Sequence, residues 1–271
     1  MGTTTSAEYF RTRRECVDYL HNRLTELVKQ RKRVLLGFDF AYGYPKGFAD
    51  ALGLSGPGEK WRKIWGLLAN LIHDEDNNQN NRFEVAEMTN RRCTGGSEPG
   101  PFWGCPKRSA SRLLPTTKPT FPFRCNNGVV LEDKRLCETR LRGTQPIWKL
   151  AYRGSVGSQT FMGIPRLYEL RDAPHLAAHS RVWPFETGFT ARLVPPKGPF
   201  ILHAEIWPGI VNNELDRNIK PKDKAQVMAM ANWAARLDAR GSLGLLFDAP
   251  QRLSQDQLSQ CREEGWILGC T

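Results

Sequence analysis

The sequence predicts an α/β fold with a mixed or parallel sheet, and two patterns support this prediction. Apolar runs of strand length alternate with stretches in which apolar residues recur every three or four positions, as on one face of a helix. The run at residues 34–40 is apolar nearly throughout, which is typical of a strand covered on both faces. Strands that alternate with helices favour the layered architecture of α/β proteins.

Each expected element follows from its own pattern. Strands are expected at residues 34–40, 147–153, 182–187 and 200–207, with a short last strand at 265–269. Helices are expected at residues 10–28, 61–71, 83–88, 160–170, 222–237 and 256–263. Residues 90–146 are rich in Pro, Gly, Ser and Arg. We interpret them as a long, loop-rich insertion within a single domain that spans residues 1–271.

Composition limits the class of protein. The 271 residues carry a net charge of +11, which permits a nucleic acid or nucleotide as partner, although a solvated basic surface explains the charge equally well. No apolar run reaches the roughly 18 residues that span a bilayer, and the N-terminus lacks the apolar core of a signal peptide. We therefore expect a cytoplasmic protein with no membrane partner. The seven cysteines show no C-x-x-C spacing, which favours reduced thiols over a zinc site.

Carboxylates at the ends of predicted elements mark the candidate site. Asp39 ends the first apolar run, Glu205 stands near the end of the run at 200–207, and Asp223 opens a predicted helix. Oxygen ligands suit Mg²⁺ or Mn²⁺, so we expect these acids to be catalytic metal ligands at one end of the sheet. Asp223 also suits a first helical turn by its charge alone. Glu186 is either a fourth metal ligand or a turn residue.

A second group of polar residues could bind substrate. A predicted strand, a glycine-rich turn at residues 154–157 and a predicted helix present backbone N–H groups as a phosphate site would. The pattern matches neither the Walker motif nor the dinucleotide-binding motif, and a plain strand-to-helix turn explains it as well. Residues before the helix at 83–88 could contact a nucleotide or cap that helix. The substrate-binding candidates are Lys149, Ser155, Ser158, Gln159, Asn81 and Arg82.

Several short segments taken together resemble one bacterial family. They are residues 34–45 (VLLGFDFAYGYP), 80–83 (NNRF), 100–106 (GPFWGCP), 148–159 (WKLAYRGSVGSQ), 183–188 (WPFETG) and 204–208 (AEIWP). Members of the family are labelled as cobalamin biosynthesis proteins of the CbiG type or as molybdopterin guanine dinucleotide synthesis proteins. The family is distantly similar to predicted nucleases of the RNase H-like fold.

The resemblance implies an RNase H-like fold whose carboxylates hold two Mg²⁺ ions. Asp39, Glu205 and Asp223 match acidic positions of the family's motifs. Relatives begin with a strand that carries V-D-W-S-A, and nothing in residues 1–9 resembles that strand. The resemblance therefore implies that an N-terminal strand is missing. The strand at 34–40 should then lie at an exposed sheet edge or pair with another subunit, which leaves a homo-oligomer open.

These observations lead to one expected function and two alternatives. The expected function is that of a Mg²⁺- or Mn²⁺-dependent phosphodiesterase or nuclease with a two-ion site. The first alternative is a non-catalytic module that binds a nucleotide or a nucleic acid. The second, which follows the family's labels, is an enzyme of cobalamin or molybdopterin cofactor biosynthesis.

Overall fold

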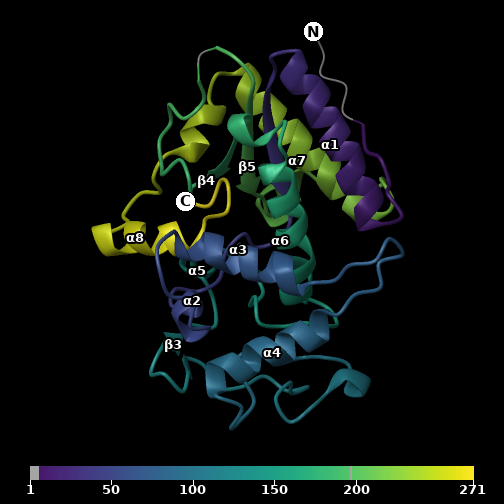
Figure 1. Cartoon of the computed structure of the whole chain (residues 1–271). Helices are drawn as coiled ribbons and strands as arrows, with labels where there is room; N and C mark the ends of the chain where they lie inside the picture. The colour runs from purple at the N-terminus through teal and green to yellow at the C-terminus, as the bar shows by residue number, and fades with distance from the viewer. Residues whose placement is uncertain (1–5, 196) are drawn as a thin grey trace.

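The computed structural model describes residues 6–195 and 197–271 and has a mixed α/β fold. Its main sheet contains three parallel strands in the order β1-β5-β4, with helices packed around them (Figure 1). A separate two-stranded antiparallel sheet, β2-β3, lies within the loop-rich insertion. The predicted α/β class is therefore confirmed at this level of description.

The secondary structure alternates along the chain. The strands are β1 (Arg33–Phe38), β2 (Phe123–Arg124), β3 (Val130–Leu131), β4 (Ser180–Trp183) and β5 (Phe200–Glu205). The α-helices are α1 (Arg13–Lys29), α2 (Phe48–Ala51), α3 (Lys60–Leu71), α4 (Arg82–Thr94), α5 (Leu136–Arg140), α6 (Val156–Asp172), α7 (Lys222–Ala239) and α8 (Gln255–Glu264). Short 3₁₀ helices are η1 (Lys107–Ser109), η2 (Ala177–His179), η3 (Pro208–Glu214) and η4 (Leu243–Phe247). Within the described ranges, no helix is both long and apolar enough to cross a membrane.

The strand predicted at 147–153 is wrong. This segment forms turns and makes one isolated bridge, between Lys149 and Trp103. The carbonyl of Lys149 accepts a hydrogen bond from the Gly157 N–H at 2.9 Å, so it is used by the start of α6 and not by a neighbouring strand. Tyr152 then turns the chain through a left-handed conformation (φ 66°) that a strand does not contain.

The four other strand predictions all extend too far. β1 and β5 end at Phe38 and Glu205, each two residues before the predicted end. The segment 265–269 forms only a bridge between Ile267 and Glu205, because Gly265 and Gly269 adopt positive φ angles on either side of it. β4 ends at Trp183, because the Glu186 N–H donates to the Val182 carbonyl at 2.8 Å and closes a turn. Helices α4 and α6 are in turn longer than predicted, since their polar first or last turns lack a clear apolar period.

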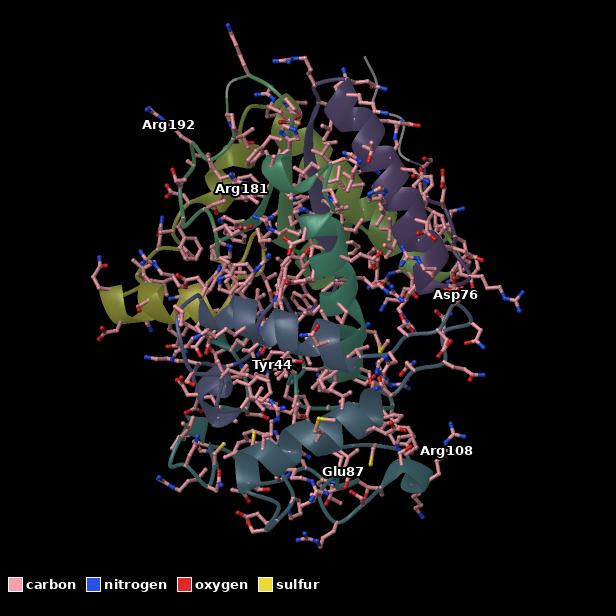
Figure 2. The ribbon with its side chains drawn as sticks, in the orientation of Figure 1. Tyr44, Asp76, Glu87, Arg108, Arg181 and Arg192 are labelled. Carbon is pink, nitrogen blue, oxygen red and sulfur yellow. The ribbon has the colours of Figure 1, made fainter. Side chains whose placement is uncertain are left out.

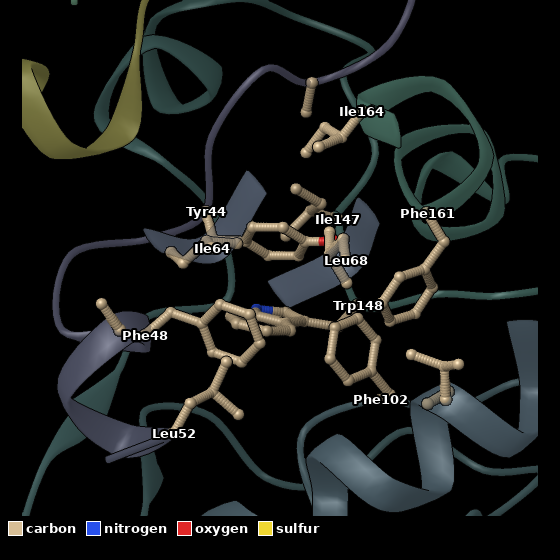
Figure 3. Close-up of a cluster of buried hydrophobic side chains, with 14 of the residues drawn as sticks. Tyr44, Phe48, Leu52, Ile64, Leu68, Phe102, Ile147, Trp148, Phe161 and Ile164 are labelled. Atoms are coloured by element: carbon tan, nitrogen blue, oxygen red, sulfur yellow. The ribbon is translucent and has the colours of Figure 1, made fainter. Parts of the chain in front are cut away.

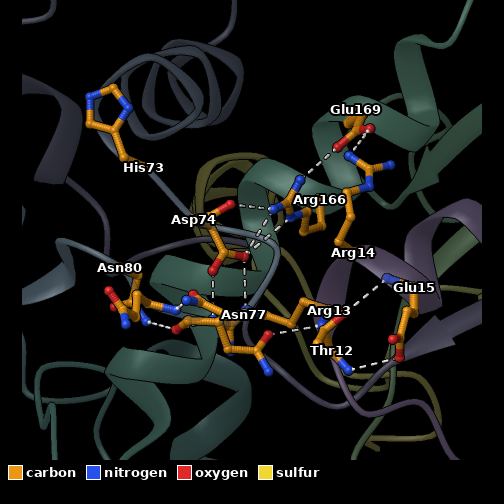
Figure 4. Close-up of polar contacts among 12 residues, drawn as sticks. Thr12, Arg13, Arg14, Glu15, His73, Asp74, Asn77, Asn80, Arg166 and Glu169 are labelled. Carbon is orange, nitrogen blue, oxygen red and sulfur yellow. Dashed lines mark hydrogen bonds and ion pairs between the residues drawn. The ribbon is translucent and has the colours of Figure 1, made fainter.

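An ion-pair cluster joins α1 and α6 to the connector at residues 73–80 (Figure 4). Asp74 is nearly buried and accepts hydrogen bonds from Arg13 (2.6 Å) and from Arg166 (3.0 Å). Helix α1 begins at Arg13. Thr12 and Glu15 form a capping box there, which satisfies N–H groups at the start of the helix. Asp74 is thus held by arginines on two helices, which balance its charge within the structure.

An aromatic cluster joins the loop-rich insertion to the rest of the molecule (Figure 3). Tyr44 and Phe48 come from the segment after β1, Phe102 comes from the insertion, and Trp148 and Phe161 come from the segment after it. All five side chains are fully buried, with ring centroids 4.5 Å apart for Tyr44 and Phe48 and 5.1 Å apart for Phe102 and Trp148. The insertion therefore shares its core with the first loop and with α6.

Close packing at the start of α6 requires a glycine, which gives the first prediction. A Cβ atom at Gly157 would lie 2.4 Å from the Ile147 carbonyl oxygen, which is backbone and cannot move aside, so we expect Gly157→Ala to lower the free energy of unfolding by about 1–3 kcal/mol. Gly66 in α3 is the matched control, because a Cβ there meets nothing within 4 Å. We expect Gly66→Ala to stabilise the protein by about 0.5–1 kcal/mol. Denaturant unfolding of both variants measures the difference, and equal effects would contradict this account.

Candidate functional site

The candidate site lies where β1 and β5 end together. These strands are parallel neighbours, and Phe38 pairs with Glu205 at their carboxyl ends. Asp39 directly follows Phe38, so two of the predicted acids, Asp39 and Glu205, lie at the same carboxyl end of the sheet. A cavity of about 140 Å³ opens there, and its lining includes Asp39, Glu138, Gln159, Glu205 and Trp207. This is the position at which α/β sheets bind ligands.

The carboxylate of Glu205 is already occupied by protein groups. Its Oε1 accepts from Arg135 Nη2 at 2.6 Å, and its Oε2 accepts from Arg135 Nη1 at 2.7 Å. Oε2 also accepts the backbone N–H of Tyr42 at 3.0 Å. Glu205 is 3% exposed, so this bidentate pair is shielded from water. Glu205 therefore serves as a buried anion for Arg135.

Arg135 has no donor left for a ligand. Besides its two bonds to Glu205, its Nε and Nη2 donate to Glu138 Oε1 at 3.0 and 2.8 Å, and its Nη1 donates to the Glu264 carbonyl at 3.1 Å. A guanidinium has five N–H donors, and these contacts use all of them. Arg135 is 1% exposed. It cannot contact a substrate phosphate without first leaving this network.

The charges of this network shift the pKa values of its members. Burial works against the charge of Arg135, but neighbouring groups, the Glu138 and Glu205 carboxylates among them, raise the pKa of Arg135 well above its ordinary value. Burial raises the pKa of Glu138, and the Coulombic attraction of Arg135 opposes that rise. One guanidinium thus faces two buried carboxylates, which leaves an excess of negative charge beside the cavity.

The network is assembled from distant parts of the chain. Arg135 and Glu138 come from the insertion, at the start of α5, and Glu205 comes from β5. Helix α8 adds Glu264, which accepts the Lys46 N–H through Oε1 and the Leu136 N–H through Oε2, both at 2.7 Å. The last helix therefore holds both the loop after β1 and the beginning of α5 in place.

Asp39 differs from Glu205 because it has no partner. Among the described residues, no hydrogen bond or ion pair reaches its carboxylate, although it stands at the mouth of the cavity. The pKa of Asp39 is raised from 3.8 to about 6, first by desolvation and then by the negative charges of Glu205 and Asp223. Part of Asp39 reaches solvent, yet the protein around it is dense enough to disfavour the charged form.

Asp223 occupies the first turn of α7 and is exposed. Within the described ranges, it makes no hydrogen bond or ion pair, and it is close enough to Asp39 to raise the pKa of that residue. Asp39, which lines the cavity, and Asp223, which lies outside its lining, therefore form a pair of neighbouring acids without a partner among the described residues.

These donors do not fit the predicted two-ion site of Asp39, Glu205 and Asp223. Both oxygens of Glu205 are engaged by Arg135, and a guanidinium beside them repels a second cation. No cluster of three or more His, Cys, Asp or Glu side chains suited to a metal ion is found in the part of the chain that the structure describes. Asp39 and Asp223 alone have the chemistry for one Mg²⁺, which often binds through one or two carboxylates and water.

Glu186, the predicted fourth ligand, is used elsewhere. Its Oε2 accepts Arg171 Nε at 3.1 Å and the Val182 N–H at 2.8 Å. The ion pair between Arg171 and Glu186 fixes the turn after β4 onto the end of α6. This matches the turn interpretation of Glu186, because both contacts hold the turn in place.

The substrate-binding candidates fall into two groups. Gln159 lines the same cavity as Asp39 and Glu205, and Gln159 is exposed. The others lie outside that lining and most make internal contacts. Lys149 Nζ donates to the Arg153 carbonyl at 2.7 Å, Arg82 Nε donates to Ser158 Oγ at 3.1 Å, and Asn81 bonds to the backbone of His73 and Leu71. Ser155 precedes α6 without forming a side-chain cap.

Sequence reasoning missed Arg135 and Glu138. Both lie in the segment that composition marks as a loop-rich insertion, and the local pattern gives no sign that either is buried. The only signal in the sequence was Glu205 itself, because a carboxylate in a buried strand requires a partner and no partner for it was predicted.

Comparisons of this chain with protein-family models, with curated proteins and with solved structures find no match.

Removal of Arg135 should strongly destabilise the protein. Arg135→Ala leaves Glu138 and Glu205 buried without their counter-ion, so we expect a loss of about 3–5 kcal/mol in the free energy of unfolding. Arg142→Ala is the matched control, because Arg142 is exposed in the same segment and should change stability by less than about 0.5 kcal/mol. Urea unfolding monitored by tryptophan fluorescence measures both. A cost below about 1 kcal/mol for Arg135→Ala would show that the network is not structural.

The raised pKa of Asp39 predicts a pH-dependent stability. In metal-free buffer the native protein holds a proton on Asp39 up to about pH 6, whereas the unfolded chain releases it near 3.8, so stability falls as pH rises between these values. Asp39→Asn removes this loss and should stabilise the protein above pH 6 but not at pH 3.8. Because solvent screens the group, we expect a gain of no more than about 1 kcal/mol. A gain from Asp39→Asn that is the same at pH 3.8 as above pH 6 would refute the account.

Proposed function

We propose that this protein is a divalent-cation-dependent phosphodiesterase or nuclease of RNase H-like fold that uses a single Mg²⁺ or Mn²⁺ ion. Asp39 and Asp223 are the proposed ligands, and Glu205 has a structural role. The observation that carries the proposal is that Asp39 is unpartnered and has its pKa raised to about 6, in part by Asp223 and Glu205. Two neighbouring acids without a counter-ion among the described residues, here Asp39 and Asp223, are typical of a site that receives a cation.

The chemistry divides between the ion and the chain. A bound Mg²⁺ supplies Lewis-acid stabilisation of a phosphoryl oxygen. Asp39 and Asp223 hold the ion when both are ionised, so cation affinity should decrease as pH falls below about 6. Gln159 lies at the same cavity with its side chain available to position substrate. Arg135 and Glu138 keep Glu205 fixed, which keeps the end of β5 in register beside Asp39.

A non-catalytic nucleic-acid-binding module is the second candidate. The observation that favours it is the pairing of Glu205 with Arg135, which leaves fewer carboxylates than a two-ion nuclease uses. The net charge of +11 would then supply the affinity for phosphates. Exposed arginines such as Arg108, Arg181 and Arg192 are, however, spread over different parts of the surface (Figure 2). This distribution does not define one binding groove.

Cation titration and cleavage assays distinguish the two candidates. We expect isothermal titration with Mg²⁺ or Mn²⁺ to show a single site and a labelled DNA or RNA oligonucleotide to be cleaved only with the cation. Asp39→Asn and Asp223→Asn should each lower cation affinity at least about tenfold, whereas Asp238→Asn should not. Glu205→Gln should reduce stability but keep cation binding at temperatures where it is folded, because Glu205 contacts Arg135.

Each candidate function predicts a different combination of results in these assays. Salt-sensitive nucleic-acid binding without cation binding or cleavage would support the non-catalytic module. Loss of cation binding in folded Glu205→Gln would restore Glu205 as a ligand and overturn the single-ion arrangement.

A further inference from the structure

The outer edge of β1 is an unused hydrogen-bonding edge. The N–H groups of Phe200 and Ile206 in the β5 chain segment donate to the carbonyls of Lys32 and Phe38. In a parallel ladder each residue directs its N–H and C=O to the same side, and successive residues alternate. Even-numbered residues of β1 therefore face β5. Arg33, Leu35 and Gly37 present their backbone groups to the opposite side, where the described residues provide no partner.

Burial along the two strands agrees with this geometry. Every residue of β5 is buried, whereas Val34 through Phe38 in β1 are only half-buried. Val34, Leu36 and Phe38 join the α1 cluster from its margin, together with Leu20 and Val28 of α1. Natural sheets protect such edges with Pro or with charged residues inside the strand. Residues 34–38 contain neither.

We propose that the outer edge of β1 pairs with β1 of a second copy of this chain, in an antiparallel arrangement about a two-fold axis. A two-fold pairing of one strand with itself is necessarily antiparallel and joins the two sheets into one. The unpaired backbone edge suits an extended segment as its occupant. Arg33 at the start of β1 and Asp39 just after its end carry opposite charges, so a second, antiparallel copy of β1 complements them.

The register follows from backbone direction and charge. Residues that exchange hydrogen bonds across an antiparallel pair must both face outward, so odd-numbered residues lie opposite odd-numbered residues. One such register places Leu35 opposite Gly37 and Arg33 opposite Asp39, with Leu36 opposite its own copy. Asp39 has no partner among the described residues of its own chain, and Arg33 makes only a 3.4 Å contact to the Pro195 carbonyl. The self-pairing therefore brings together opposite charges that the single chain leaves apart.

The dimer also bears on the proposed function, and this consequence rests on that function. Arg33 of the second copy would lie beside Asp39, at the mouth of the cavity. A guanidinium beside Asp39 opposes cation binding there, as Arg135 does at Glu205. Mg²⁺ and the second copy of β1 should therefore compete for Asp39. Association is measured without metal or substrate, so it is tested separately from catalysis.

Solution mass is the first test. We expect light scattering after size-exclusion chromatography to give twice 30.8 kDa for the metal-free chain at micromolar concentration. Arg33→Glu should shift the protein to monomer, because the introduced carboxylate would face Asp39 of the other copy. The double variant Arg33→Glu, Asp39→Arg restores opposite charges across the axis and should recover the dimer. A monomer of the unmodified chain at all concentrations overturns the proposal.

Cross-linking tests the register independently of charge. In the proposed pairing Leu36 faces its own copy in a non-hydrogen-bonded pair, where Cα atoms are about 4.5 Å apart, so Leu36→Cys should form an intermolecular disulfide under mild oxidation with diamide. Val34→Cys is the matched control on the same face of β1. In this register Val34 lies opposite Phe38 of the second copy, so the two Val34 residues are four positions apart along the strands and too distant for a disulfide. The unmodified chain gives the background from Cys16, which is partly exposed. A dimer in which Leu36→Cys does not cross-link, or Val34→Cys does so equally, overturns this interface.

Discussion

The buried guanidinium of Arg135 is the interaction on which the rest of this structure depends. It joins Glu138 in the insertion, Glu205 in the central strand and the backbone of Glu264 in the last helix. Buried ion pairs add little net stability compared with apolar packing, but they penalise every arrangement in which a partner is missing. The network therefore specifies how the insertion meets the sheet more than it strengthens the fold.

The same network explains the character of the cavity. A single positive charge is shared by two carboxylates, and Asp39 and Asp223 add further negative charge without any counter-ion among the described residues. A free phosphate would be repelled from such a site. A cation would be attracted, and a phosphate could follow once the cation is present. Electrostatics thus separate Glu205, which is paired with Arg135, from Asp39 and Asp223, which have no counter-ion among the described residues, although the three acids look equivalent in the sequence.

Local patterns predicted the elements whose apolar period is unbroken. β1, β5, α3 and α7 lie close to their expected positions, and Asp39 lies at the strand end where the sequence placed it. The segment 147–153 failed because its apolar residues serve an aromatic core, while its carbonyls bond to the start of α6. Glu205 could be recognised as an acid that needs a partner. Its partner could not be identified, because Arg135 lies 70 residues away in a segment without periodicity.

The contacts of α8 have a consequence for the order of folding. Glu264 holds the Lys46 and Leu136 backbones, and the adjacent Glu263 accepts the Gly47 N–H at 2.8 Å. These bonds join residues that are 128 to 218 positions apart in the sequence. Contacts between such distant residues close long loops and therefore form late in folding. The loop after β1 and the start of α5 should accordingly reach their final positions only when α8 packs against them.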